Sequence, residues 1–173
     1  MNLKWVKSLG VEEGASFLDC RLYTSSCCGR AHPSVRMWVT EFDIRNKNIP
    51  SEFYDGEPGN RRMKSVETGC IAFRHPSEYP DNPGCRLSAE DRPNDCLTCV
   101  ICCREESRLF VFLSCPDVCR VIKKLLYRDA GVEEYVRSCA RIFAQDDELR
   151  RRSSEWAKDF RYVLDIGLIE DWL

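Results

Sequence analysis

The chain has 173 residues, about the size of one domain, which is long enough to bury a core without crosslinks. Its 26 Lys and Arg residues nearly balance its 28 Asp and Glu residues, so it lacks the basic excess of a protein that coats nucleic acid. No run reaches the roughly 18 apolar residues that a membrane-spanning helix needs, and we expect no membrane association.

The twelve cysteines indicate the compartment. The first residues, MNLKWVK, interrupt their apolar positions with lysines, unlike the apolar core of a signal peptide, and no Asn-x-Ser/Thr glycosylation site occurs. We therefore expect an intracellular protein, cytoplasmic or nuclear. In such a reducing compartment, clustered cysteines bind metal or act in catalysis more often than they form disulfides, which are the alternative.

Residues 1–95 are predicted to form a cysteine-containing strand and loop region. VRMWVTEFDI (35–44) is rich in β-branched and aromatic residues, which predicts a strand, and CIAFRH (70–75) predicts another. Between 45 and 95, six prolines and the turn sequences DGEPGN and PDNPGC limit regular structure to short pieces. A loop-rich stretch of this length needs a local organiser, for which Cys70, His75 and Cys85 are candidate metal ligands.

A second group of candidate ligands lies near the N-terminus. CCGRAH (27–32) offers a Cys-x3-His pair with a glycine that permits the tight turn of a metal loop. Combined with residues of the 45–95 stretch, it predicts a mixed Cys/His zinc site. The candidate ligands of this site are Cys27, Cys28, His32, Cys70 and His75.

CCGRAH is also similar to the Cys-Cys-Gly-x-x-His element of small cysteine-rich proteins of some plant RNA viruses. The similarity covers six residues. What the similarity implies is one version of the functional prediction: a virus-encoded accessory protein that modulates its host.

The densest cysteine cluster is CLTCVICCREESRLFVFLSCPDVCR (96–120), which contains six of the twelve. Two overlapping Cys-x2-Cys pairs predict a metal-binding knuckle, and the turn sequence REES before RLFVFL (108–113) predicts a hairpin. Two more cysteines then begin a helix, where residues i and i+4 share a face and the helix dipole favours thiolates. Four thiolates satisfy the tetrahedral coordination of structural zinc. The predicted ligands are Cys96, Cys99, Cys115 and Cys119, with Cys102 as a competitor for the knuckle.

This order of knuckle, hairpin and ligand-bearing helix resembles the treble-clef type of zinc finger over residues 96–126. The resemblance implies one structural zinc ion held between the knuckle and the helix. The chain departs from the family in one respect, because it has Cys-x3-Cys on the helix where the family usually has Cys-x2-Cys.

Residues 96–173 are predicted to contain this unit and a packet of about three helices. Apolar stripes with helical spacing occur in 116–128, after Gly131, and from about 146 to 166, with Gly167 as a C-terminal stop. The last helix is expected to bury Leu149, Trp156, Phe160, Val163 and Leu164. The tail LIEDWL (168–173) either docks on a partner or folds back. The whole chain is predicted to be one compact α+β domain, with a zinc-stabilised N-terminal part.

No catalytic motif is present: the sequence has no Gly-rich phosphate loop, no His-Glu-x-x-His and no Gly-x-Ser-x-Gly. A thiol enzyme would have to pair Cys28 or Cys70 with one of the two histidines. We therefore expect a non-enzymatic interaction or regulatory protein that uses zinc as a scaffold and binds a protein partner rather than a small-molecule substrate. RNA binding through Arg150, Arg151 and Arg152 is the alternative, although these arginines also fit an ordinary solvated helix surface.

Overall fold

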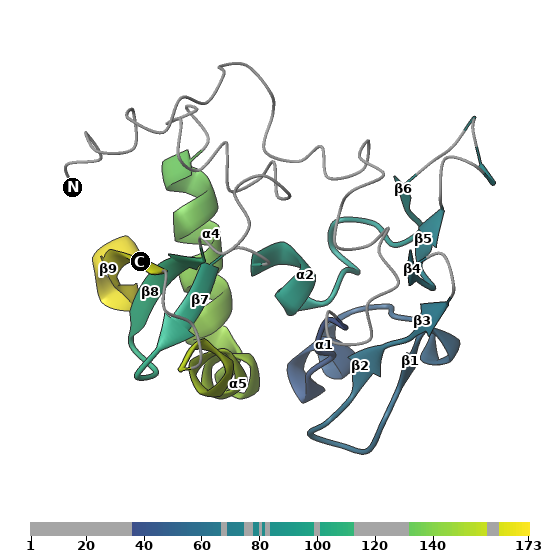
Figure 1. Ribbon diagram of the computed structural model, residues 1–173, viewed down its shortest axis with the longest axis horizontal. Coiled ribbons are helices and arrows are strands. Elements are labelled where there is room, and N and C mark those ends of the chain that lie inside the picture. The colour runs from purple at the N-terminus through teal and green to yellow at the C-terminus, as the bar shows by residue number, and fades with distance from the viewer. Residues whose placement is uncertain are drawn as a thin grey trace. The chain divides into compact units, whose positions relative to one another are not determined.

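The computed structural model describes residues 36–66, 69–74, 78–79, 81, 84–98, 101–112, 132–158 and 163–173. They fall into two compact units (Figure 1). The middle unit ends at Leu97, and the C-terminal unit takes up the chain from Thr98 to Leu173. Helices and small antiparallel sheets both occur, which confirms the α+β class. Within the described ranges, no helix is long and apolar enough to cross a membrane.

The middle unit consists of short elements around a small core. Its elements are α1 (Glu41–Asn46), the 3-10 helix η5 (Ser51–Phe53), β1 (Tyr54–Asp55), β2 (Arg62–Met63), β3 (Ser65–Val66), β4 (Gly69–Cys70), β5 (Phe73–Arg74), β6 (Gly84–Cys85) and α2 (Asn94–Thr98). The strands pair in succession as three antiparallel two-residue ribbons, β1 with β2, β3 with β4, and β5 with β6. Its described residues form one buried apolar cluster of Val39, Ile49, Phe53, Met63, Ala72 and Leu87.

The strand predicted over residues 35–44 is wrong in its second half. Trp38 forms an isolated bridge with Arg62, but the chain enters α1 at Glu41. Thr40 caps this helix: its hydroxyl accepts the Asp43 N–H at 3.2 Å, and the Asp43 carboxylate accepts the Thr40 N–H at 3.1 Å. This reciprocal capping box is a local helix-start signal, and it outweighs the β-propensity of the surrounding residues.

The strand predicted over residues 70–75 is divided by a turn. β4 ends at Cys70, Ile71 and Ala72 form the turn, and β5 begins at Phe73. The Ile71 N–H donates to the Lys64 carbonyl at 3.0 Å, whereas the Ala72 carbonyl accepts the Arg86 N–H at 2.7 Å. The two halves therefore pair with different parts of the chain, β4 with β3 and β5 with β6, on either side of the turn.

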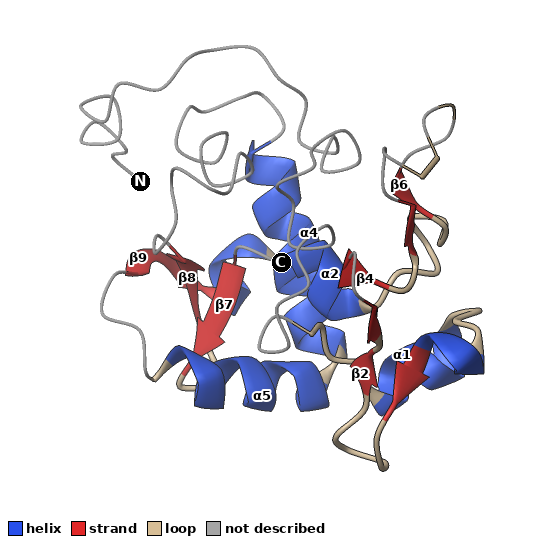
Figure 2. Cartoon of the chain, turned by 45° about the vertical axis from the view of Figure 1, so that its right-hand side comes forward, coloured by secondary structure: helices blue, strands red, loops and turns tan. Residues whose placement is uncertain are grey.

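The C-terminal unit is a three-stranded antiparallel sheet with two helices. Its elements are β7 (Ile101–Arg104), β8 (Arg108–Phe112), α4 (Val132–Gln145), α5 (Asp147–Ala157), β9 (Val163–Leu168) and the 3-10 helix η6 (Ile169–Trp172). The strand order is β7-β8-β9, and α5 packs against β7 (Figure 2). The hairpin predicted around REES and the helix predicted after Gly131 are confirmed. The helix predicted over 116–128 lies outside the described residues.

The long helix predicted from 146 to 166 is wrong beyond Ala157. Residues 163–168 form β9, which pairs antiparallel with β8 through a register shift between Leu109 and Phe110. Ile166 is buried while its neighbour Asp165 is exposed, as expected for a strand with one covered face. Gly167 therefore lies inside a strand rather than at a helix end. The described part of this unit contains two of the three predicted helices, α4 and a shorter α5, and the third, over 116–128, stays a prediction.

The prediction that Trp156 is buried is also wrong, because its side chain is 45% exposed. The buried residues of α5 are Leu149, Ser154 and Ala157, which define the helix face that meets the sheet. Without the extension of the helix to residue 166, this face is shorter than the predicted stripe. Trp156 falls outside it.

The C-terminal tail folds back onto its own unit, which was one of the two alternatives. Ile169 is buried, and η6 packs against α4. The indole N–H of Trp172 donates to the Ile166 carbonyl at 2.9 Å. Leu173 is exposed.

Candidate functional site

The described residues test only part of the predicted ligand sets. Cys70, Cys96 and Cys102 are described, and the thiols of Cys70 and Cys102 form no disulfide. Within the described ranges, no group of three or more His, Cys, Asp or Glu side chains could hold a metal. The other predicted ligands lie outside these ranges: Cys27, Cys28, His32, His75, Cys99, Cys115 and Cys119.

Cys96, the first residue of the predicted knuckle, lies on the short helix α2. Its backbone N–H donates to the Pro93 carbonyl at 2.9 Å, which forms the first turn of the helix. Its side chain is half-buried. The zinc knuckle itself stays a prediction, because its second residue, Cys99, is outside the described residues.

Cys102 and Cys103 are adjacent residues of β7, so their side chains point to opposite faces of the sheet. Both are buried, and the Cys103 N–H donates to the Ser153 hydroxyl of α5 at 2.8 Å. Burial raises the pKa of Cys102 to about 11 and that of Cys103 to about 12. Cys139 of α4 is fully buried, and burial raises its pKa to about 12. All three are protonated core thiols at neutral pH, where a cysteine behaves as a small buried apolar side chain.

Cys70 and Cys85 form a different kind of pair, on the surface of the small core of the middle unit. Cys70 is the last residue of β4, and the turn of Ile71 and Ala72 follows it. Cys85 lies on β6, directly opposite Phe73 of β5. Burial raises the pKa of Cys70, and the charge of Cys85 adds to that effect.

A glycine with a left-handed backbone precedes each of these two cysteines. Gly69 has a φ of 127° and Gly84 a φ of 114°, a conformation that other residues rarely adopt. The dipeptides Gly69-Cys70 and Gly84-Cys85 therefore enter their strands through the same kind of bend. The signal was present in the sequence as two Gly-Cys pairs, but only the structure shows that both cysteines pack against the same core cluster.

The predicted RNA-binding arginines all lie on α5, and each forms an ion pair with a carboxylate of the same helix. Arg150 pairs with Asp147 at 2.5 Å, Arg151 with Glu155 at 2.7 Å, and Arg152 with Glu148 at 3.1 Å. These acids offset the positive charge of the helix surface. The role of the arginines in RNA binding stays a prediction.

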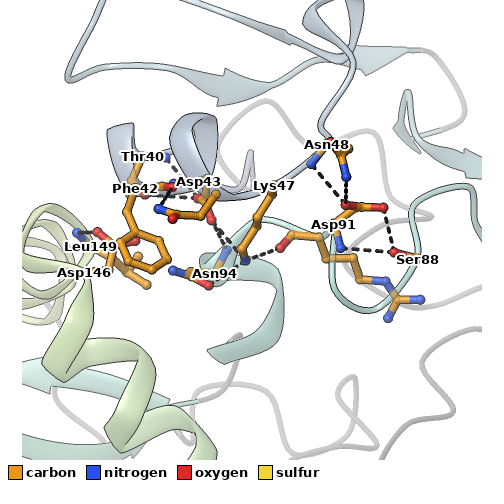
Figure 3. A network of polar contacts seen from close by, with 12 residues as sticks. Thr40, Phe42, Asp43, Lys47, Asn48, Ser88, Asp91, Asn94, Asp146 and Leu149 are labelled. Carbon is orange, nitrogen blue, oxygen red and sulfur yellow. Dashed lines mark hydrogen bonds and ion pairs between the residues drawn. The ribbon is translucent and has the colours of Figure 1, made fainter.

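A buried polar network in the middle unit was not predicted from the sequence (Figure 3). The Asp43 side chain is fully buried, and its carboxylate accepts the Asn94 N–H at 2.9 Å and lies 3.1 Å from the Lys47 ammonium. Lys47 also donates to the Asn94 side chain at 2.6 Å and to the Arg92 carbonyl at 2.5 Å. Burial raises the pKa of Asp43, while the Lys47 charge opposes that effect. Because its polar groups are paired with one another, we assign this network a structural role.

Asp91 lies at the edge of this network, and its pKa is shifted in the opposite direction to that of Asp43. Its carboxylate accepts the Ser88 hydroxyl at 2.8 Å and the Asn48 N–H at 3.0 Å. These hydrogen bonds, that of Ser88 first, lower the pKa of Asp91 below its ordinary value of 3.8. The two carboxylates therefore respond to pH with opposite signs.

An open pocket of about 410 Å³ lies on the C-terminal unit beside β9 and η6, lined by Arg108, Asp165, Ile166, Gly167, Asp171 and Trp172. Its polar side chains bond to their own surroundings. Arg108 pairs with Asp165 at 2.6 Å, and the carboxylates of Asp165 and Asp171 accept the N–H groups of Gly167 and Leu168. The pocket therefore offers no cluster of convergent polar groups for a ligand among these residues.

Comparisons of the chain with protein-family models, with curated proteins and with solved structures gave no match.

Proposed function

We propose that this chain is a zinc-binding, non-enzymatic interaction protein of the cell interior, in which the metal is a structural scaffold and the bound partner is another protein. The observation that supports a metal scaffold is the construction of the middle unit. Its described residues combine three two-residue ribbons with a small apolar core, in which six buried side chains are lined by six partly buried ones.

Such a unit has little free energy to oppose the entropy of ordering its loops. Small cores rarely supply more than about 3 to 5 kcal/mol, and small domains commonly add metal ions or disulfides. A structural zinc ion adds its binding free energy directly to the free energy of folding. Free thiols at the surface of the small core, Cys70 and Cys85, supply suitable donors.

The thiol chemistry supports a scaffold rather than a thiol enzyme. A catalytic cysteine needs a lowered pKa or an adjacent base, so that thiolate is present at neutral pH. Burial instead raises the pKa of four described thiols, those of Cys70, Cys102, Cys103 and Cys139. Three of these four are also inaccessible to a substrate, because they are buried in the C-terminal unit.

The scaffold is tested by measuring zinc content and free thiols on the purified chain, before and after treatment with a strong chelator. We expect about one or two zinc ions per chain and, on chelation, loss of protease resistance in the middle unit. A metal-free protein that is equally resistant to protease with and without chelator would contradict the scaffold. A protein whose cysteines are oxidised to disulfides would contradict both the scaffold and the intracellular location.

A protein partner is supported by the exposed side chain of Trp156 on α5. Tryptophan is enriched among the residues that contribute most to protein interfaces. Crosslinking of the intact chain to its bound proteins, compared between the wild type and Trp156→Ala, tests this surface. We expect a partner that is lost in Trp156→Ala and retained in Arg141→Ala, which changes an exposed arginine of α4.

RNA binding is distinguished from this proposal by its salt dependence. An RNA-binding surface would lose affinity steeply as salt rises and would weaken when Arg150, Arg151 and Arg152 are replaced together by alanine. Because each arginine pairs with a carboxylate of its own helix, we expect neither effect. Both effects together would favour RNA as the partner.

A further inference from the structure

We propose that the side chains of Asp171 and Trp172 form an edge cap on β9, and that this edge cap prevents β9 from pairing with β9 of a second copy of the chain. The two side chains bind the outward backbone groups of β9 that an added strand would need. Both residues belong to the C-terminal unit, so the edge cap is independent of the zinc scaffold.

β9 lies at one edge of its sheet, because the strand order is β7-β8-β9 (Figure 2). Within the described part of the chain, β8 is the only strand that pairs with β9. An edge strand presents backbone N–H and C=O groups to which a strand of another chain can bind. Natural proteins protect such edges with charged side chains, irregular backbone or covering segments.

The hydrogen bonds at the end of β9 show which of its backbone groups face outward. The Ile169 N–H, directly after β9, donates at 2.8 Å to the carbonyl of Ser107, directly before β8. Adjacent residues of a strand direct their backbone groups to opposite sides, so the Leu168 N–H faces away from β8. Ile166 lies two positions before Leu168, and its backbone groups therefore face the same way.

The edge cap occupies one outward group of each of these two residues. The Leu168 N–H donates to the Asp171 carboxylate at 3.0 Å, and the Ile166 carbonyl accepts the indole N–H of Trp172 at 2.9 Å. A strand added to the outer side of β9 would have to form hydrogen bonds to these same groups. The edge cap and an added strand therefore compete for one surface.

The backbone between the two capped groups is shaped for this close approach. A Cβ built on Gly167 would lie 3.2 Å from Asp171 Oδ2, closer than a Cβ normally approaches another atom, and 3.6 Å from Trp172 Nε1. The tail is also held from its other side, because Ile169 is buried and η6 packs against α4. The position of the edge cap is thus fixed by the fold of the C-terminal unit.

The opposite edge of the sheet is protected in a comparable way. The N–H of Cys103 in β7 donates to the Ser153 hydroxyl of α5 at 2.8 Å, and α5 packs along β7. Side chains from outside the sheet therefore bind backbone groups at both edges. β7 is covered by a helix, whereas an open pocket of about 410 Å³ lies beside β9 and η6. Access to the outer edge of β9 accordingly depends on the two side chains of the edge cap.

The strand that an uncapped β9 would bind is β9 of a second copy. In a solution of the pure protein, every available strand edge comes from the same sequence. Two identical edges pair about a two-fold axis, which makes the paired strands antiparallel. Because α5 covers β7, β9 is the edge of this sheet that two copies can share. Their pairing would join two three-stranded sheets into one continuous sheet.

The test measures the molar mass of the full chain by light scattering over a wide range of protein concentration. It compares the wild type with the double variant Asp171→Ala, Trp172→Phe, which removes the capping carboxylate and the indole N–H but keeps an aromatic ring. We expect the mass of the double variant to rise with concentration toward twice that of the wild type. Leu173→Ala changes an exposed tail residue and should behave as the wild type. The same concentration dependence in the wild type and the double variant overturns the edge cap.

A second measurement separates pairing through β9 from association of a partly unfolded protein. Amide hydrogen exchange is followed residue by residue with NMR. In the dilute double variant, we expect the Leu168 N–H to lose protection while the Ile169 N–H keeps it, because Ser107 still accepts the latter. At high concentration the Leu168 N–H should regain protection, since a carbonyl of the second copy accepts it. Association without renewed protection of Leu168 overturns pairing through β9.

A third variant removes the outward donor itself. Leu168 has a φ of −78°, which proline can adopt, and proline has no N–H to donate. We expect Leu168→Pro, added to the double variant, to restore the mass of the wild type at every concentration. Continued association of this triple variant overturns the assignment of β9 as the shared edge.

Discussion

The Asp43 carboxylate accepts the backbone N–H of Asn94 at 2.9 Å, and this hydrogen bond connects α1 to the start of α2 across 51 positions of sequence. The same carboxylate completes the capping box with Thr40 and pairs with the buried Lys47 ammonium. One side chain thus stabilises a helix start, neutralises a buried cation and joins two distant segments of the middle unit.

Replacing Asp43 with alanine should destabilise the protein by about 3 kcal/mol or more, because it leaves the Lys47 charge buried without its partner and removes the helix cap. Chemical denaturation measures the loss. The control is Glu41→Ala, which breaks the more exposed ion pair with Arg61 and should cost about 1 kcal/mol or less. Equal costs for the two variants would show that the buried network has no special role.

The pH dependence of stability should reflect the raised pKa of Asp43. Burial raises this pKa above its ordinary value of 3.8, so the native state binds the proton more tightly than the unfolded chain. The part of Asp43's contribution to stability that comes from proton binding is therefore fully present below about pH 3.8 and lost as pH rises through the pKa of the folded state. The free energy of unfolding of the wild type, relative to that of Asp43→Asn, should decline as pH rises from about 3.8 to the pKa of Asp43 in the folded state. Above that pKa the difference should stay constant.

Asp91→Asn is the control, because the expected dependence of stability on pH has the opposite sign at Asp91. The hydrogen bonds from Ser88 and Asn48 lower the pKa of Asp91, so its contribution is present above its ordinary pKa of 3.8 and lost as pH falls through the folded value. The stability of the wild type relative to Asp91→Asn should decline toward acid. Urea denaturation of both variants over about pH 3 to pH 7 measures the two slopes, and slopes of the same sign would contradict the assignment.

The C-terminal tail should contribute to the core of its own unit. Ile169→Ala removes a buried side chain from the contact between η6 and α4 and should cost about 2 to 4 kcal/mol. Leu173→Ala changes a side chain that is 62% exposed and should change stability by about 0.5 kcal/mol or less. Thermal or urea denaturation measures both, and a negligible effect of Ile169→Ala would indicate that the tail is displaced in solution.

The buried thiols of the C-terminal unit should be unreactive in the folded protein. A thiol whose pKa is about 12, like those of Cys103 and Cys139, has about a thousandfold less thiolate at neutral pH than one at the ordinary value of 9.0. For Cys102, with a pKa of about 11, the reduction is about a hundredfold. Timed alkylation read by mass spectrometry should label all three only after unfolding. Rapid labelling of any of them in the folded state would revive the thiol-enzyme alternative.

Local sequence determined the parts of the fold whose signals lie within a few residues. The hairpin of β7 and β8 follows from a turn sequence between two apolar runs, and α4 follows from its apolar spacing. The start of α1 was equally local, since Thr40 and Asp43 form its capping box, but the β-branched and aromatic residues around it favoured a strand. In short elements, local helix and strand preferences are similar in strength. The hydrogen bonds of the folded chain then determine which of the two structures forms.

Tertiary structure decided what depends on partners far along the chain. Residues 163–168 have an apolar spacing compatible with a helix, yet they form β9 because the edge of β8 offers hydrogen bonds to them. Similarly, the sequence identified Cys70 and Cys85 as candidate ligands of a loop-rich stretch, while the folded chain packs both against one core cluster and sets Cys85 opposite Phe73. Composition determines which groups are available for chemistry, but their distance in space is set by strand register, which depends on contacts that a linear sequence does not display.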